Sequence, residues 1–229
     1  MYLIIFDCDG TLVDSQDTIV SGMDAAFSAV GLVPPRAASL GIVGLSLEVA
    51  IDRLVEDEHR HLVPQMAEVY RASKIAERKV GGGLDPLYPG ARAAIDALHA
   101  RDDVLLGVAT GKALRGVVRM VEVHDRLVTI QTADRAPSKP HPGMILQAME
   151  EETGASPENT VMIGDTSYGD TSYDVAMARN AGVTGMGVSW GYHDRPLLTQ
   201  AGAATILDDF ADLVPELGRK FGWQIEGIA

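Results

Sequence analysis

Short continuous runs of apolar residues recur along the chain and predict buried strands. They cover residues 3–6, 104–109, 128–132, 160–164, 186–189 and 205–207. Runs this short are typical of parallel strands that are covered on both faces. Between them, apolar residues at helical spacing predict helices, as at Leu114, Val117, Val118 and Val121. These repeated strand–helix units predict an α/β fold with a doubly wound, mostly parallel, Rossmann-like sheet.

The stretch from residue 14 to residue 86 has a different pattern. Its apolar residues keep helical spacing, and none of its segments is typical of a strand. Ser15 is placed to cap the first of these helices, and Gly81-Gly82-Gly83 interrupts the pattern near the end. We therefore expect an all-helical cap domain over residues 14–86, inserted into a core made of residues 1–13 and 87–229. Asp14-Ser15 and Gly81 to Gly83 would connect the two.

The net charge of the chain argues against some classes of binding protein. Its 19 Lys and Arg against 32 Asp and Glu give a net charge of −13, which disfavours binding to nucleic acid or to an anionic membrane. No apolar run approaches the roughly 20 residues that span a bilayer, and the first residues lack the basic region of a signal peptide. Because Cys8 is the only cysteine, we expect no intrachain disulfide and a cytoplasmic location.

Polar residues follow four of the predicted strands. The segments are Asp7-Cys8-Asp9-Gly10-Thr11, Thr110-Gly111-Lys112, Ser138-Lys139-Pro140 and Gly164-Asp165-Thr166. Ligands of open parallel sheets bind beyond the carboxyl ends of the strands, so these side chains are expected to converge. Carboxylate oxygens suit Mg²⁺, while a lysine and a hydroxyl can donate to an anion. The combination is typical of a site for a phosphate ester.

The order of these motifs resembles the haloacid dehalogenase superfamily. The segment from Asp7 to Ser15, then Thr110, then Lys139-Pro140, then Gly164-Asp165-Thr166 match its motifs in sequence. The resemblance covers nearly the whole chain, including a helical cap after the first strand. It is closest to the phosphoglycolate phosphatase-like and β-phosphoglucomutase-like branch, and it implies a phosphatase that acts on small phosphorylated metabolites.

The resemblance also implies a role for each matching residue. Asp7 would be the nucleophile that forms an aspartyl-phosphate, and Asp9 would act as general acid and then as general base. Thr110 and Lys139 would bind the phosphoryl group, together with the backbone around Cys8, Gly10, Thr11 and Gly111, where Gly10 leaves free N–H groups. Asp7, the Asp9 carbonyl and Asp165 would hold Mg²⁺, and Asp170 is a further candidate ligand.

A tandem repeat interrupts this pattern, because Gly-Asp-Thr-Ser-Tyr occurs at residues 164–168 and again at 169–173. Asp165 keeps its place directly after a strand, whereas Asp170 and Asp174 keep the expected spacing of four residues. The position directly after the strand and the spacing of four residues cannot both be kept unless the loop rearranges. We favour Asp165 as the metal ligand, with Asp170 or Asp174 orienting water or Lys139.

Two alternatives fit the same residues. One is a phosphomutase of the same fold, and the other is a binding protein whose metal site the repeat has disrupted. The flexible segment 41–46 is the part of the cap best suited to close on a substrate. Arg71, Lys74 and Arg78 share a helical face that is more typical of a solvated cap surface than of a substrate clamp. The oligomeric state and the particular phosphate ester stay open.

Overall fold

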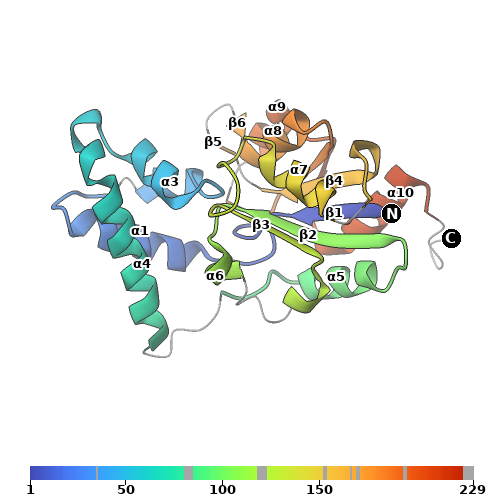
Figure 1. Cartoon of the computed structure of the whole chain (residues 1–229), viewed down its shortest axis with the longest axis horizontal. Helices are drawn as coiled ribbons and strands as arrows, with labels where there is room; N and C mark the ends of the chain where they lie inside the picture. Colours follow the sequence, from blue (N-terminus) through green and yellow to red (C-terminus); the bar gives the residue numbers. More distant parts are fainter. Residues whose placement is uncertain are drawn as a thin grey trace.

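Six parallel strands form one sheet in the order β3-β2-β1-β4-β7-β8 (Figure 1). The computed structural model describes residues 1–34, 36–79, 85–117, 123–151, 154–165, 167–168, 171–192 and 195–223. The strands are β1 (Tyr2–Phe6), β2 (Val104–Thr110), β3 (Thr129–Thr132), β4 (Thr160–Gly164), β7 (Thr184–Val188) and β8 (Thr205–Leu207). All six predicted strands are confirmed, with small shifts at their ends.

Helices cover both faces of this sheet, as the short apolar runs predict. Along β1, Ile4 and Phe6 pack in one apolar cluster with α5 (Ala91–His99) and α10 (Leu213–Phe221). Leu3 and Ile5 point the other way and pack with α7 (Gly143–Glu150) and α8 (Tyr173–Asn180). Successive side chains of a strand alternate between faces, so one short apolar strand contributes to two cores.

The remaining core elements are short. They are α6 (Leu114–Val117), α9 (Arg195–Ala201), the paired strands β5 (Ser167–Tyr168) and β6 (Thr171–Ser172), and 3₁₀ turns at His124–Arg126, Pro157–Asn159 and Phe210–Asp212. Of the helix predicted from Leu114 to Val121, the part after Val117 lies outside the described residues. Among helices in the described ranges, none has both the length and the apolar character needed to cross a membrane.

The inserted segment is helical and has its own apolar core. It contains α1 (Gln16–Ser28), α2 (Arg36–Gly41), α3 (Leu47–Leu54), a 3₁₀ helix at Asp57–Leu62 and α4 (Val63–Lys79). In Figure 1 it lies beside one end of the sheet, with α1 and α4 packed side by side. Met23, Phe27, Ile51 and Met66 are central to its core and are at most 2% exposed. This cap confirms the predicted fold class.

The two chain connections between cap and core run side by side. The Asp14 N–H donates to Pro86 O at 2.9 Å, and the Tyr88 N–H donates to Leu12 O at 2.9 Å. Val13 and Leu87 form an antiparallel bridge between them. We propose the domain boundaries here, with residues 14–86 as the cap and residues 1–13 and 87–229 as the core. The predicted connection at Gly81 to Gly83 lies outside the described residues.

Candidate active site

Asp7 stands at the carboxyl end of the central strand β1. Its backbone N–H donates to Ile163 O at 2.8 Å, and its Oδ1 accepts from the Cys8 N–H at 2.7 Å. Phe6 is opposite Val108 on β2 and opposite Ile163 on β4, so the ends of three strands meet around Asp7. The Asp7 side chain is fully buried.

Two further carboxylates and an ammonium surround Asp7. Oxygen atoms of Asp7, Asp165 and Asp174 lie within 4.8 Å of one another, and all three residues are buried. Lys139 Nζ lies 2.8 Å from Asp7 Oδ1 and 2.6 Å from Asp174 Oδ1. The structure therefore brings the predicted Asp7, Lys139 and Asp165 together.

The electrostatics of this cluster favour an added cation. Burial raises the pKa of Asp7 to about 8, and the Lys139 ammonium opposes this rise while the Asp174 and Asp165 carboxylates increase it. Burial alone would lower the pKa of Lys139, but the Asp174 and Asp7 carboxylates raise it above its ordinary value. With all three carboxylates ionised, they and the one ammonium would carry a formal charge of −2 among buried side chains. A hard divalent ion that prefers oxygen ligands fits this donor set.

Within the tandem repeat, the described residues include a short hairpin pairing, and Asp165 and Asp174 on either side of it belong to the cluster. After β4, residues 167–168 pair with residues 171–172 in antiparallel register, and α8 then starts at Tyr173. Asp165 precedes this hairpin and Asp174 follows it, so both reach the cluster. Asp174 contacts Lys139, which is one of the two predicted possibilities. The other candidate, Asp170, lies outside the described residues.

Thr11 and Tyr192 hold Asp165 in place. The Thr11 hydroxyl donates to Asp165 Oδ1 at 3.2 Å, and the Tyr192 N–H donates to Oδ2 at 2.8 Å. Gly10 has a φ of +79°, and a Cβ there would lie 2.4 Å from Asp165 Oδ2. Glycine is therefore required at position 10 both for its backbone angle and for the space that Asp165 occupies.

The Asp9 side chain lies apart from the acidic cluster. Its Oδ1 accepts from Ser15 Oγ at 2.5 Å and is ion-paired with Lys112. Ser15 was expected to cap α1, but its side chain makes no cap hydrogen bond and contacts Asp9 instead. Sequence reasoning gave no role to Lys112, although it directly follows Thr110-Gly111. It also missed Tyr192, for which the motifs gave no signal.

Several of the predicted phosphate-binding groups are buried or already hydrogen-bonded within the protein. Thr110 is buried at the end of β2, and its hydroxyl accepts from the Lys112 N–H at 3.2 Å. The Gly10 N–H donates to Val13 O at 2.9 Å, so the expectation of a free N–H there is wrong. Cys8 is buried in the core, and burial raises the pKa of its thiol, which makes it a poor nucleophile.

The cap segment 41–46 rests on the core beside these groups. A Cβ at Gly111 would lie 2.3 Å from Leu45 O, so this glycine allows close contact between the two backbones. The Ser46 N–H donates to Ser138 Oγ at 3.0 Å, next to Lys139. The segment predicted to close on a substrate therefore contacts two of the polar strand ends.

Comparison with known proteins identifies the family to which this chain belongs. The sequence profile of the haloacid dehalogenase-like hydrolases matches residues 4–188. This chain belongs to that family. It is 34% identical over 222 residues to a protein named probable phosphatase IndB from Dickeya dadantii, covering 93% of this chain and 91% of the relative. It is 32% identical over 231 residues to a phosphoglycolate phosphatase from Agrobacterium fabrum, covering 95% and 93%.

Solved structures agree on the fold. A hydrolase from Pseudomonas syringae superposes with a TM-score of 0.79 at 23% identity, covering 96% of this chain and 99% of that one. The comparisons of sequence and fold together identify an enzyme of the phosphoric monoester hydrolase type.

Proposed function

We propose that this enzyme is a Mg²⁺-dependent phosphatase that hydrolyses small phosphomonoesters through an aspartyl-phosphate on Asp7. The observation that carries the proposal is the buried Asp7 carboxylate, which contacts the Lys139 ammonium at 2.8 Å within a group of three carboxylates. Phosphoglycolate is the substrate that the names of several relatives suggest. A cytoplasmic location stays a prediction from the single cysteine.

In the first half of the reaction, an Asp7 oxygen attacks phosphorus while the bond to the leaving-group oxygen breaks. Asp9 gives its proton to that oxygen, so the leaving group departs as a neutral alcohol. Ser15 and Lys112 keep the Asp9 carboxyl in one orientation. Lys139 offsets the negative charge on Asp7 and on the phosphoryl oxygens, and the Thr110 hydroxyl donates to one of those oxygens.

In the second half, the Asp9 carboxylate takes a proton from water, and the water oxygen attacks phosphorus. The bond between phosphorus and Asp7 breaks, which releases inorganic phosphate and restores both aspartates. The same Asp9 carboxyl thus loses a proton in one step and regains it in the next. The contact of cap residues 45 and 46 with the core limits the access of water before the leaving group departs.

Mg²⁺ fits the donor set and the charge of the cluster. Asp7 and Asp165 would hold it together with the Asp9 carbonyl, and Asp174 or Asp170 would complete the acidic surroundings. When bound, the ion offsets negative charge on the phosphoryl group. Asp174 keeps Lys139 beside Asp7, and Thr11 keeps Asp165 in place.

Release of inorganic phosphate from a panel of phosphomonoesters tests the proposal, with Mg²⁺ and with chelator. We expect release that stops with chelator and that Asp7→Asn abolishes. Asp17→Asn, an exposed aspartate on α1, is the matched control and should be fully active. A fully active Asp7→Asn enzyme would contradict the proposed mechanism. Transfer that requires a bisphosphate and releases little phosphate would instead favour the phosphomutase.

A further inference from the structure

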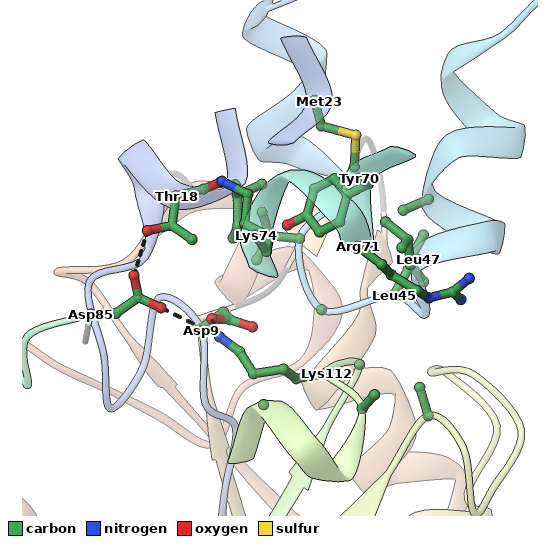
Figure 2. Close-up of a pocket in the computed structure, with 18 of the residues that line it drawn as sticks. Asp9, Thr18, Met23, Leu45, Leu47, Tyr70, Arg71, Lys74, Asp85 and Lys112 are labelled. Atoms are coloured by element: carbon green, nitrogen blue, oxygen red, sulfur yellow. Dashed lines mark hydrogen bonds and ion pairs between the residues drawn. The ribbon is translucent and has the colours of Figure 1, made fainter. Parts of the chain in front are cut away.

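A cavity of about 520 Å³ lies between the cap and the core, next to Asp9. In Figure 2, Met23 and Tyr70 border it from the cap helices and Leu45 from the cap segment, while Lys112 extends from the core toward Asp9. The volume falls within the range of about 300–1,000 Å³ that is typical of sites for drug-sized ligands. It is far larger than a two-carbon acid requires.

The position of Asp9 indicates which part of a substrate occupies this cavity. Asp9 lines the cavity, whereas Asp7 and Lys139 do not. In the proposed function, Asp7 contacts phosphorus and Asp9 contacts the leaving-group oxygen. The leaving group therefore extends from Asp9 into the cavity, on the side away from the buried acidic cluster.

Much of the wall is apolar. Side chains from α1, the cap segment and α4 supply aliphatic and aromatic surface: Ile19, Met23, Ile42, Val43, Leu45 and Tyr70. Most of them are also buried in the structure. An apolar leaving group would remove its own surface from water, together with the part of the wall that is still exposed, which favours binding in proportion to the buried area.

Three of the four cations in the wall are already held by acidic partners. Lys74, predicted to be solvated, is only 6% exposed and lies 2.6 Å from Glu77 Oε2. Its ammonium also donates to Thr18 O at 2.6 Å and to Ser21 Oγ at 2.7 Å. The prediction of a solvated face is therefore wrong for Lys74, because α1 packs against α4 and its residues Thr18 and Ser21 contact the ammonium.

Two of the other three lining cations are also ion-paired. Arg71 is ion-paired with Glu48, and Lys112 with Asp9 and, at 3.7 Å, with Asp85. Arg115 is the remaining lining cation and is exposed. In the described residues, the wall holds these four cations and five carboxylates, which are Asp9, Glu48, Glu77, Asp85 and Asp134. A carboxylate on the leaving group would meet no net positive charge and would compete with existing ion pairs.

We propose that the preferred substrates are phosphate monoesters of neutral alcohols with an apolar body larger than two carbons, and not phosphoglycolate. This inference rests on the proposed phosphatase function and names the substrate class of the same site. The relatives' names point to an anionic two-carbon leaving group. The size of this cavity, its apolar wall and the pairing of three of its four cations favour a larger neutral one.

Three esters separate the contributions of size and charge. Ethyl phosphate and phosphoglycolate differ only in a methyl group against a carboxylate, and benzyl phosphate adds an apolar ring. With Mg²⁺ present, we expect kcat/KM for phosphate release to be about tenfold or more higher for benzyl than for ethyl phosphate. Ethyl phosphate should in turn be better than phosphoglycolate. A preference for phosphoglycolate would overturn the inference and leave the phosphatase function standing. No release from any of the three, nor from p-nitrophenyl phosphate, would overturn both.

A variant that fills the cavity gives a second test. Ala113 lines the cavity at the loop after β2, so Ala113→Phe should lower the benzyl-to-ethyl ratio of kcat/KM by about tenfold. Ala93→Phe, at an exposed position on α5, is the matched control and should leave the ratio unchanged. An unchanged ratio in Ala113→Phe would show that the leaving group does not occupy the cavity.

Discussion

Lys139→Met removes the ammonium that lies among three buried carboxylates. The substitution keeps an unbranched side chain of similar length, so it changes charge more than packing. Lys139 and Asp7 have fully buried side chains, and that of Asp174 is 1% exposed. The formal charge of the cluster would change from −2 to −3 if every carboxylate stayed ionised.

The cost of this change follows from the burial of both ion pairs. Removing one partner of a buried pair costs about 3–5 kcal/mol, because the remaining charge is left uncompensated. Asp7 has a pKa of about 8, above its value in an unfolded chain. Loss of the ammonium, which lowers the pKa of Asp7, favours protonation of Asp7 in the folded variant and offsets part of the cost. We therefore expect a larger cost near pH 8 than near pH 6.

Urea unfolding followed by tryptophan fluorescence in the presence of chelator measures this loss of unfolding free energy. Lys220→Met is the control, since Lys220 is exposed; its ammonium donates to the Thr184 hydroxyl and lies 5.2 Å from the centre of the Phe221 ring. It should change stability by less than about 0.5 kcal/mol. A loss below about 1 kcal/mol for Lys139→Met at pH 8 would refute the reasoning, because that is the contribution of an exposed pair.

Two further predictions concern metal binding. Deleting residues 169–173 restores a single copy of the repeat and keeps Asp165 and Asp174. The Mg²⁺ dissociation constant from calorimetry should change by less than about threefold, since shortening the connection between them by five residues alters closure entropy little. A large loss of affinity would show that the hairpin positions the ligands. For the intact enzyme, Mg²⁺ binding must displace the proton that Asp7 carries below its pKa of about 8. The affinity should therefore rise by up to about tenfold per pH unit from pH 6 to pH 8 and then level off, and a flat profile would contradict this coupling.

The fold could be predicted because its signals are local and repeated. Each strand is a short apolar run, and the burial of β1 on both faces explains why Leu3 to Phe6 lacks alternation. The helical insertion was visible as a long stretch without such a run. The hairpin at residues 167–172 was not predicted, since its two strands have two residues each and no apolar pattern.

The sequence could predict only those site residues that lie at or after the ends of predicted strands. Asp7 and Asp165 directly follow strands and Thr110 ends one, whereas Lys139 lies seven residues after β3; all four are buried. The partners of Asp9 could not be predicted in this way. Ser15 has the sequence context of a helix cap, and only the tertiary fold brings its hydroxyl to the Asp9 carboxylate.

The prediction that Lys74 is solvated was wrong for a related reason. Helical spacing shows which residues share a face, but not whether that face borders water or a cavity between two domains. Here the face lies over the opening between cap and core, and Glu77 makes the burial of a lysine possible. The packing of α1 against α4, which places Thr18 and Ser21 beside the Lys74 ammonium, creates this environment.

The central claim is that Asp7 becomes phosphorylated during turnover. Asp9→Asn should trap this state, since an amide cannot deprotonate water, while p-nitrophenyl phosphate needs little help from an acid. Acid quenching and peptide mass mapping of this variant should give about one equivalent of nitrophenol and one phosphoryl group, located on the peptide that contains Asp7. The same experiment with Asp7→Asn should give neither. A nitrophenol burst with no phosphoryl group on Asp7, or with one on another residue, would contradict the account.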